Sequence, residues 1–255
     1  MDGRFFELDA NLQALRERQA KLSPALVEEF SRRLDVSWIY HDSALEGVVL
    51  SYSEIKAAID KNIISDVSLI PSYQEIKLFK LGMEWAREYA AARKRPIHVE
   101  TIRKLYSILT PEEVAKGIPY RRDNPLHRLY YHEISPPDKI VNRMKKLAEW
   151  FEEDSTKRMH PVERAARAHY RLMSIYPWTK NTGRVARLVS NLMLERDGYP
   201  LAIIHSIDRQ RYYEVLRAEH AGLIPLYLES VNTAIETALK FYDETAAVSV
   251  RRRAG

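Results

Sequence analysis

The stretch from Ser174 to Arg187 carries the residues whose types and spacing are best suited to binding an anion. An apolar segment leads into a loop that contains Pro177, and a second apolar segment starts near Thr182. Unpaired backbone N–H groups at a helix start attract anions, and Thr182 is a suitable N-cap. Arg184 and Arg187 project from one side of this second helix. Phosphate is the natural anion for such a site, and an exposed face solvated by both arginines is the alternative.

The elements that must position this segment show helical periodicity. Apolar residues recur at intervals of three and four in eight segments, which predicts an all-α helical bundle. These segments are 30–45, 76–83, 102–109, 141–151, 165–173, 185–192, 212–216 and 226–241. Thr110-Pro111 and Gly198-Tyr199-Pro200 are expected to end two of the helices.

The stretch from Gly117 to Pro137 interrupts this periodicity. It contains Gly-Ile-Pro-Tyr, Asn-Pro and Pro-Pro sequences and has no helical stripe. A short β-hairpin fits four of its residues, namely Leu126, Leu129, Tyr130 and Tyr131. Long irregular segments inside compact domains are often functional, so we expect 117–137 to have a functional role.

Composition and charge exclude several classes of protein. The chain has 255 residues, of which 45% are hydrophobic and 29% charged, which is typical of globular proteins. No apolar run could cross a bilayer and no signal pattern is seen, so we expect a cytoplasmic protein with no membrane partner. The absence of cysteine excludes disulfides and thiolate metal sites. A net charge of +5 is spread along the chain, so nucleic acid is not an expected partner.

The segment 174–187 resembles the signature of the Fic family, His-Pro-Phe-x-(Asp/Glu)-Gly-Asn-Gly-Arg-x-x-Arg. Four positions match it: Pro177, Gly183, Arg184 and Arg187. Trp178 replaces the phenylalanine. Flanking segments are similar as well: His160–Tyr170, Leu188–Ile204, Asp208–Tyr213 and Tyr120–Pro137. The resemblance covers residues 97–243. It implies a Fic-type all-α fold with a short β-hairpin flap, and a relation to enzymes that transfer AMP from ATP to a protein hydroxyl.

Substitutions at the base, the metal ligand and the turn alter the chemistry that this resemblance implies. Tyr176 occupies the position of the catalytic histidine. A phenol with a pKa of about 10 is protonated at neutral pH and is a poor general base. Lys180 replaces the acidic residue that holds Mg²⁺ in the family, so we expect no metal ligand there, and its ammonium group would instead contact phosphate. Asn181 and Thr182 replace Gly-Asn, and asparagine tolerates the left-handed conformation that the turn requires.

The family resemblance also implies a ligand site. ATP or another nucleotide is the expected ligand, and its phosphates would contact six residues: Lys180, Asn181, Thr182, Gly183, Arg184 and Arg187. Tyr212 and His220 are expected beside the base. A protein target would dock at the flap, residues 117–137.

A further resemblance concerns the segment from Asp42 to Gly47. It is similar to the inhibitory helix of Fic proteins, Ser/Thr-x-x-x-Glu-Gly/Asn, with Glu46 matching and Asp42 at the Ser/Thr position. The resemblance implies that Glu46 pairs with Arg187 and blocks the γ-phosphate. The inhibitory segment could act in its own chain or on a neighbour in a homodimer.

These features predict three parts: an N-terminal helical extension (1–95) that includes the inhibitory helix, a Fic-like core (96–243) and a solvated C-terminal tail (244–255). The leading hypothesis is a catalytically degenerate Fic protein that retains an autoinhibited nucleotide pocket. A working transferase with a different donor is the second hypothesis. A scaffold that binds peptides along the flap edge is the third.

Overall fold

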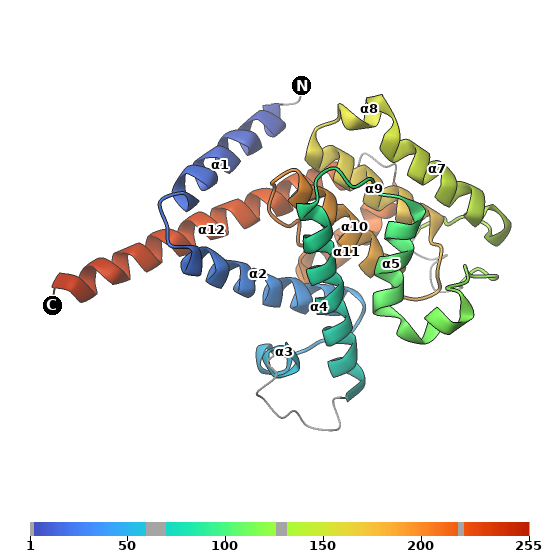
Figure 1. Cartoon of the computed structure of the whole chain (residues 1–255), viewed down its shortest axis with the longest axis horizontal. Helices are drawn as coiled ribbons and strands as arrows, with labels where there is room; N and C mark the ends of the chain where they lie inside the picture. Colours follow the sequence, from blue (N-terminus) through green and yellow to red (C-terminus); the bar gives the residue numbers. More distant parts are fainter. Residues whose placement is uncertain (1–2, 60–69, 126–131, 219–221, 255) are drawn as a thin grey trace.

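The computed structural model describes residues 3–59, 70–125, 132–218 and 222–254 as an assembly of helices (Figure 1). The α-helices are α1 (Gly3–Gln19), α2 (Pro24–Leu45), α3 (Tyr52–Ile59), α4 (Ile70–Ala91), α5 (Val99–Leu109), α7 (Ile140–Glu152), α8 (Asp154–Lys157), α9 (Pro161–Ile175), α10 (Thr182–Arg196), α11 (Arg209–Arg217) and α12 (Leu223–Ala254). Short 3₁₀ helices are η2 (Pro111–Lys116), η3 (Pro137–Lys139) and η4 (Ser206–Asp208). The all-α prediction is confirmed.

No strand occurs in the part of the chain that the structure describes. The four residues expected in the flap hairpin fall in 126–131, outside the described residues. Their described flanks, 118–125 and 132–136, are neither helical nor paired as strands. The hairpin therefore stays a prediction.

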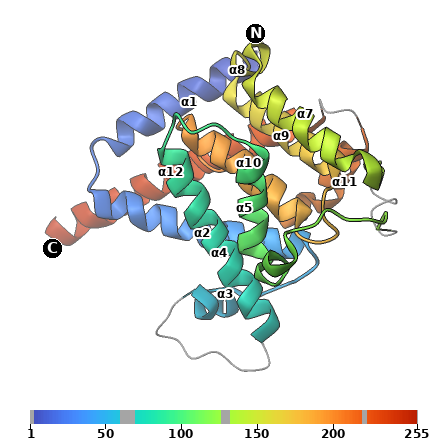
Figure 2. The ribbon, with the colours of Figure 1, turned by 45° about the vertical axis from the view of Figure 1, so that its right-hand side comes forward.

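Helix α10 is the centre of the fold. Every residue from Thr182 to Leu194 is buried, and α10 packs against α4, α5 and α9. In Figure 2, α4, α5 and α9 lie around it. A helix that is enclosed on all sides belongs to the core, so the polar residues on α10 must find partners inside the protein.

The eight predicted helices are all present, and the end of the last one differs from expectation. Helix α12 continues past Phe241 to Ala254, so residues 244–254 extend a helix instead of forming a separate tail. In Figures 1 and 2 this end projects beyond the other helices. The sequence analysis missed α1, whose residues Phe5, Leu8, Leu12 and Leu15 form a buried stripe, and α3. Helix α1 packs along α12.

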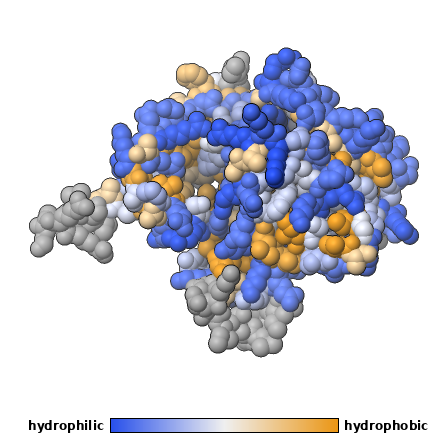
Figure 3. All heavy atoms as spheres, viewed as in Figure 1, coloured by the Kyte–Doolittle hydropathy of each residue, from blue (hydrophilic) through white to orange (hydrophobic). Residues whose placement is uncertain are grey.

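One face of the molecule is mostly polar. Figure 3 shows a largely hydrophilic face with small apolar patches between charged side chains. Within the described ranges, no helix combines the length and apolar character needed to cross a membrane.

Candidate functional site

The loop between α9 and α10 is shaped by two residues in the left-handed conformation. Tyr176 ends α9 with φ 49°, and its N–H donates to the carbonyl of Leu172 at 2.9 Å. Asn181 precedes α10 with φ 59°, which agrees with the expectation that asparagine preserves this turn. The Nδ2 atom of Asn181 donates to the carbonyl of Leu109 at 3.4 Å. The start of α10 is thereby anchored to the end of α5.

Thr182 does not serve as the N-cap, and that prediction is wrong. Asn181 is the N-cap, and it makes no side-chain capping hydrogen bond. The Oγ1 atom of Thr182 donates to the carbonyl of Trp178 at 2.8 Å and accepts from the Trp178 N–H at 3.2 Å. Thr182 therefore closes the loop and leaves the backbone N–H groups at the start of α10 without a side-chain cap.

Arg184 and Arg187 are buried, with only 6% and 2% of their surfaces exposed. The Nε atom of Arg184 donates to Asp42 Oδ2 at 2.9 Å, and its Nη1 lies 3.2 Å from Glu75 Oε2. The Nε atom of Arg187 donates to Asp42 Oδ1 at 2.5 Å, and its Nη2 donates to Glu46 Oε1 at 2.7 Å. The alternative of an exposed, solvated arginine face is wrong, because carboxylates of the same chain bind both groups.

These carboxylates also keep the arginines charged inside the core. Burial acts to lower the pKa of Arg187, but the nearby Asp42 and Glu46 outweigh it and hold the pKa well above its usual value. The same balance raises the pKa of Arg184. Two permanent positive charges therefore lie at the first turns of α10.

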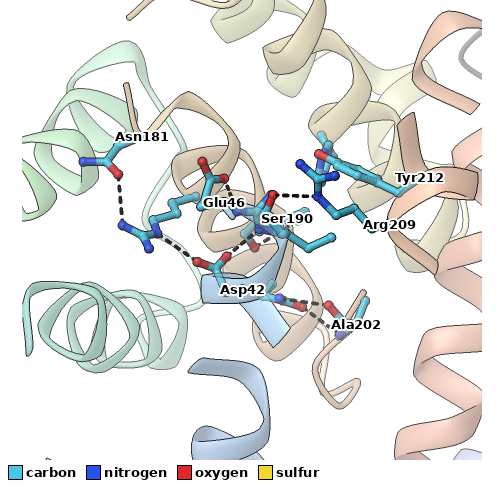
Figure 4. Close-up of polar contacts among 12 residues, drawn as sticks. Asp42, Glu46, Asn181, Ser190, Ala202, Arg209 and Tyr212 are labelled. Atoms are coloured by element: carbon cyan, nitrogen blue, oxygen red, sulfur yellow. Dashed lines mark hydrogen bonds and ion pairs between the residues drawn. The ribbon is translucent and has the colours of Figure 1, made fainter. Parts of the chain in front are cut away.

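Asp42 is the residue whose role the sequence analysis missed. Its side chain is fully buried and bridges the two guanidinium groups. Figure 4 shows Asp42 on α2, and Glu46 just after the end of this helix, facing the start of α10. The signal was present in the sequence, because residues four apart on a helix share a face. A carboxylate one turn before Glu46 must point toward the same arginines.

Glu46 lies over the start of α10. It is the C-cap of α2, and Gly47 follows it in the left-handed conformation with φ 91°. A Cβ atom at Gly183 would lie 2.9 Å from Glu46 Oε1 and 3.1 Å from Arg187 Nη1. Glycine at 183 therefore lets the carboxylate approach the helix backbone. The expected Glu46–Arg187 ion pair is present, and its carboxylate lies where a helix N-terminus attracts an anion.

A cleft of about 920 Å³ opens beside this cluster. Its lining includes Glu46, Lys180, Asn181, Arg184 and Tyr213. This volume falls within the range of small-molecule sites in proteins. The cleft therefore has room for a ligand as large as a nucleotide next to Arg184, whereas Thr182, Gly183 and Arg187 lie behind its lining.

Lys180 lies at the rim of the cleft and is ion-paired with Glu112 of η2. Their hydrogen bond raises the pKa of Lys180 and lowers that of Glu112. Both side chains are about half exposed, so the pair is one that water screens. No group of three His, Asp or Glu side chains suited to a metal ion occurs in the described part of the chain. Lys180 itself cannot ligate Mg²⁺, because its ammonium group donates hydrogen bonds and has no acceptor.

Tyr212 was expected beside the nucleotide base, but it lies in the core. Its OH pairs with Nε2 of His169 at 2.9 Å, and Nδ1 of His169 pairs with the OH of Tyr227 at 2.6 Å. Burial raises the pKa of Tyr212 and lowers that of His169. Neutral imidazole has one donor and one acceptor, so one phenol donates to it and the other accepts. Tyr213 lines the cleft instead, and His220 lies outside the described residues.

Tyr176 is also buried, with 1% of its surface exposed, and it is absent from the described residues that line the cleft. Its ring lies 6.2 Å from the ring of His132, edge to face. Its backbone carbonyl accepts a hydrogen bond of 2.6 Å from Nε of Arg121. The expected catalytic position therefore holds an aromatic side chain that packs inside the protein.

Helix α2 is held against the core by a pair of histidines. The rings of His41 and His205 stack at 4.3 Å, and Nδ1 of His41 accepts from the Ser206 N–H at 3.1 Å. Burial and the neighbouring His205 lower the pKa of His41 to about 4, although Asp208 acts in the opposite direction. The docked position of α2 therefore favours the neutral form of His41.

This contact predicts a pH-dependent stability. The pKa of His41 is about 6.5 when unfolded and about 4 when folded, so the unfolded state binds more protons within this window. The contribution of His41 to the free energy of unfolding is then fully present above pH 6.5, and it is lost as the pH falls toward 4. The side chain is only partly buried, so we expect a loss of about 1–2 kcal/mol, below the unscreened limit.

The measurement is urea denaturation at pH 7 and pH 5 of the wild-type protein and of His41→Gln. The glutamine variant should lose less stability between the two pH values, because it has no group to titrate at this position. Equal losses in both proteins would show that His41 does not couple pH to the docking of α2.

The chain is similar to known proteins over most of its length. A model of the Fic/DOC family matches residues 96–194. Protein adenylyltransferase Fic of Drosophila ananassae is 29% identical over 237 residues, which cover 91% of this chain and 45% of the relative. The chain thus spans less than half the length of that relative.

Solved structures share the fold. A crystal structure of a Fic domain containing signaling protein from Bacteroides thetaiotaomicron superposes with a TM-score of 0.81 at 24% identity, covering 94% of this chain and 98% of the other. Fic-1 (residues 134–508) from C. elegans gives 0.75 at 22% identity, covering 95% of this chain and 73% of the other.

Proposed function

Because a model of the Fic/DOC family matches residues 96–194, we propose that this protein binds ATP in the cleft at the start of α10 and restrains its own site through α2. Its similarity to the protein adenylyltransferase Fic of Drosophila ananassae supports ATP as the ligand. One observation carries the proposal: Asp42 and Glu46 engage two buried arginines beside a cleft of about 920 Å³.

The arrangement of charge supports phosphate binding. Arginine forks pair with phosphate in the same planar geometry that they use for carboxylate. Glu46 Oε1 lies 2.7 Å from Arg187 Nη2, next to Gly183. A phosphate group that approached this helix start would meet the carboxylate first. Binding of ATP therefore requires Glu46 to move, and that requirement is the proposed autoinhibition.

The chemistry of AMP transfer would be weakened in this chain. A hydroxyl that attacks the α-phosphorus forms one P–O bond and releases pyrophosphate, and its proton must be accepted by a base. Tyr176 is a buried phenol, which is protonated at neutral pH. Loss of a general base costs about 10²–10⁴-fold in rate. We therefore propose that this protein retains nucleotide binding and transfers AMP slowly, if a protein target docks beside residues 117–137.

ATP titration by calorimetry tests the site. Glu46→Gly, which removes the competing carboxylate, should bind ATP, and adding Arg184→Gln should weaken binding at least tenfold. The matched control is Arg211→Gln in the same background. Arg211 is an arginine on α11 whose partner is Glu229, outside the cleft lining, and its loss should leave affinity unchanged.

A further variant tests the site at a position where a substitution is not expected to unfold the protein. Lys180→Ala in the Glu46→Gly background alters an exposed side chain on the cleft rim, and it should weaken ATP binding several-fold without unfolding the protein. Absence of ATP binding by both the wild-type protein and Glu46→Gly would overturn the proposal. If neither Arg184→Gln nor Lys180→Ala weakened ATP binding, the ligand would have to bind outside this cleft.

A further inference from the structure

A second basic cavity lies at the opposite end of α10 from the cleft. Its volume is about 320 Å³. It is enclosed by the connection between α4 and α5, by the segment from the end of α7 to α8, and by the first turn of α9 and the last turn of α10. Helix α10 has 15 residues, and a rise of 1.5 Å per residue separates the two sites by about 20 Å. The cavity is therefore distinct from the proposed ATP site.

Positive charge dominates the cavity lining. Six cations line it, namely Arg93, Lys94, Arg95, Lys157, Arg164 and Arg196, against the two carboxylates Glu152 and Asp197. Lys157 pairs with Glu152 at 2.9 Å, and Arg164 pairs with Asp197. In the described part of the chain the other four cations have no carboxylate partner within ion-pair distance. The lining thus carries four uncompensated positive charges around one hollow.

Arg196 is the most unusual of these groups. Its Nε and Nη2 atoms are buried and have no hydrogen-bond acceptor among the described residues. Its guanidinium group lies over the ring of Tyr89, with Cζ 5.7 Å from the ring centre. Buried polar groups in native proteins are nearly always paired, and an unpaired one indicates a missing partner such as water or an ion.

The ring of Tyr89 lies beside the guanidinium groups of both Arg196 and Arg95. The OH of Tyr89 donates to the carbonyl of Pro96 at 2.8 Å, which fixes the ring against the connection between α4 and α5. Arg95 lies near the same ring, with Cζ 5.6 Å from its centre. Tyr89 therefore positions two guanidinium groups at the edge of one cavity, which is the geometry of an anion site rather than of scattered surface charge.

Helix termini offer a simpler explanation for part of this charge. Helices α4 and α10 both end here, and cations near a helix C-terminus are favourable. One cation at each terminus would satisfy that preference. It does not account for four uncompensated cations around one hollow, nor for buried N–H groups on Arg196 that no acceptor contacts.

We propose that this cavity binds a small anion of the phosphate class, such as pyrophosphate or the phosphate groups of a nucleotide, through Arg93, Arg95 and Arg196. Guanidinium groups bind phosphate oxygens in pairs, and several arginines can contact one phosphate from different sides. The volume of about 320 Å³ accommodates a group of this size. The two sites share no lining residue, so a test of this proposal does not decide the proposed function.

Calorimetric titration with inorganic pyrophosphate tests the proposal, and Lys180→Ala serves as the background that weakens the ATP cleft. We expect saturable binding in this background and a loss of at least tenfold in affinity on adding Arg95→Gln with Arg196→Gln. The single change Arg93→Gln removes an exposed side chain and should weaken binding at least threefold without risk to the fold. The matched control Arg211→Gln should change nothing.

Two results would overturn the proposal. One is the absence of saturable pyrophosphate binding in the Lys180→Ala background. The other is an affinity that Arg93→Gln and the Arg95→Gln/Arg196→Gln pair leave unchanged. A parallel titration with ADP identifies the source of the phosphate: tighter binding of ADP than of pyrophosphate supports a nucleotide, and equal affinity supports the free anion.

Discussion

Replacing Asp42 by asparagine is expected to lower the free energy of unfolding by about 3 kcal/mol, the lower end of what breaking a buried ion pair costs. Asp42 is fully buried and donor groups of both Arg184 and Arg187 lie within 2.9 Å of its oxygens. Asparagine keeps the shape but replaces one acceptor oxygen with an amide that faces a guanidinium. The two buried positive charges would then lose the carboxylate that they share, and only Glu46 and the half-exposed Glu75 would still offset them.

The magnitude depends on burial, and the same chain supplies the comparison. Asp35 lies on the same helix and pairs with Arg87 at 2.8 Å, but the Arg87 side chain is 38% exposed. Water can solvate that arginine when its partner is lost, so Asp35→Asn should cost about 1 kcal/mol or less. Glu46→Gln should also cost about 1 kcal/mol, since Arg187 keeps its bond to Asp42.

Urea denaturation followed by circular dichroism at pH 7 measures all three variants. The proposed role of Asp42 requires its loss to exceed that of Asp35 by at least about 2 kcal/mol, the difference between breaking a buried pair and an exposed one. Equal losses at the two positions would mean that the arginines on α10 are compensated by other groups, and that α2 contributes little to their stability.

Helix positions were predictable from the sequence, but burial around α10 was not. The stripe formed by Val185, Leu188 and Leu192 identifies one apolar side, and the two arginines then appear to occupy a polar face. In the structure all sides are buried, because α2 covers the arginines with carboxylates. A contact between residues more than 140 positions apart has no local signature, so only the family resemblance pointed to Glu46.

Local patterns also left individual roles undetermined. Tyr212 and Tyr213 are adjacent on α11, so their side chains point about 100° apart, and only one can face the cleft. Nothing local indicates which one it is, and the structure places Tyr213 there. Threonine at a helix start predicts an N-cap, but Thr182 bonds both backbone groups of Trp178. The stripe of α1, in contrast, has a local signature, because Phe5, Leu8, Leu12 and Leu15 follow helical spacing.

Replacing Glu46 by glycine is expected to tighten ATP binding at least tenfold relative to the wild-type protein. The carboxylate of Glu46 lies next to Gly183 and binds Arg187 at 2.7 Å. Two like charges about 4 Å apart repel by roughly 4 kcal/mol at the effective dielectric of a protein surface. Because the 18%-exposed carboxylate can partly turn to water, we expect a gain of about 10- to 100-fold, or about 1.4–2.8 kcal/mol.

A second variant separates charge from bulk. Glu46→Gln keeps the volume of the side chain and removes its charge, so an equal gain from both variants would identify repulsion of phosphate as the cause. A gain from Glu46→Gly alone would identify steric obstruction over Gly183, where a Cβ atom would already lie 2.9 Å from Glu46 Oε1. Titration of each variant with ATP by calorimetry gives the dissociation constants.

The control is Glu112, another carboxylate on the cleft rim, whose side chain is about half exposed and pairs with Lys180. Glu112→Gln removes one negative charge from the same cleft, but water screens it, so its gain should stay below threefold. A gain as large as that from Glu46→Gly would mean that ATP responds to the overall charge of the cleft.

An affinity that Glu46→Gly leaves unchanged would show that this carboxylate does not compete with phosphate. Asp42 remains on both arginines in each of these variants, which limits the expected gain.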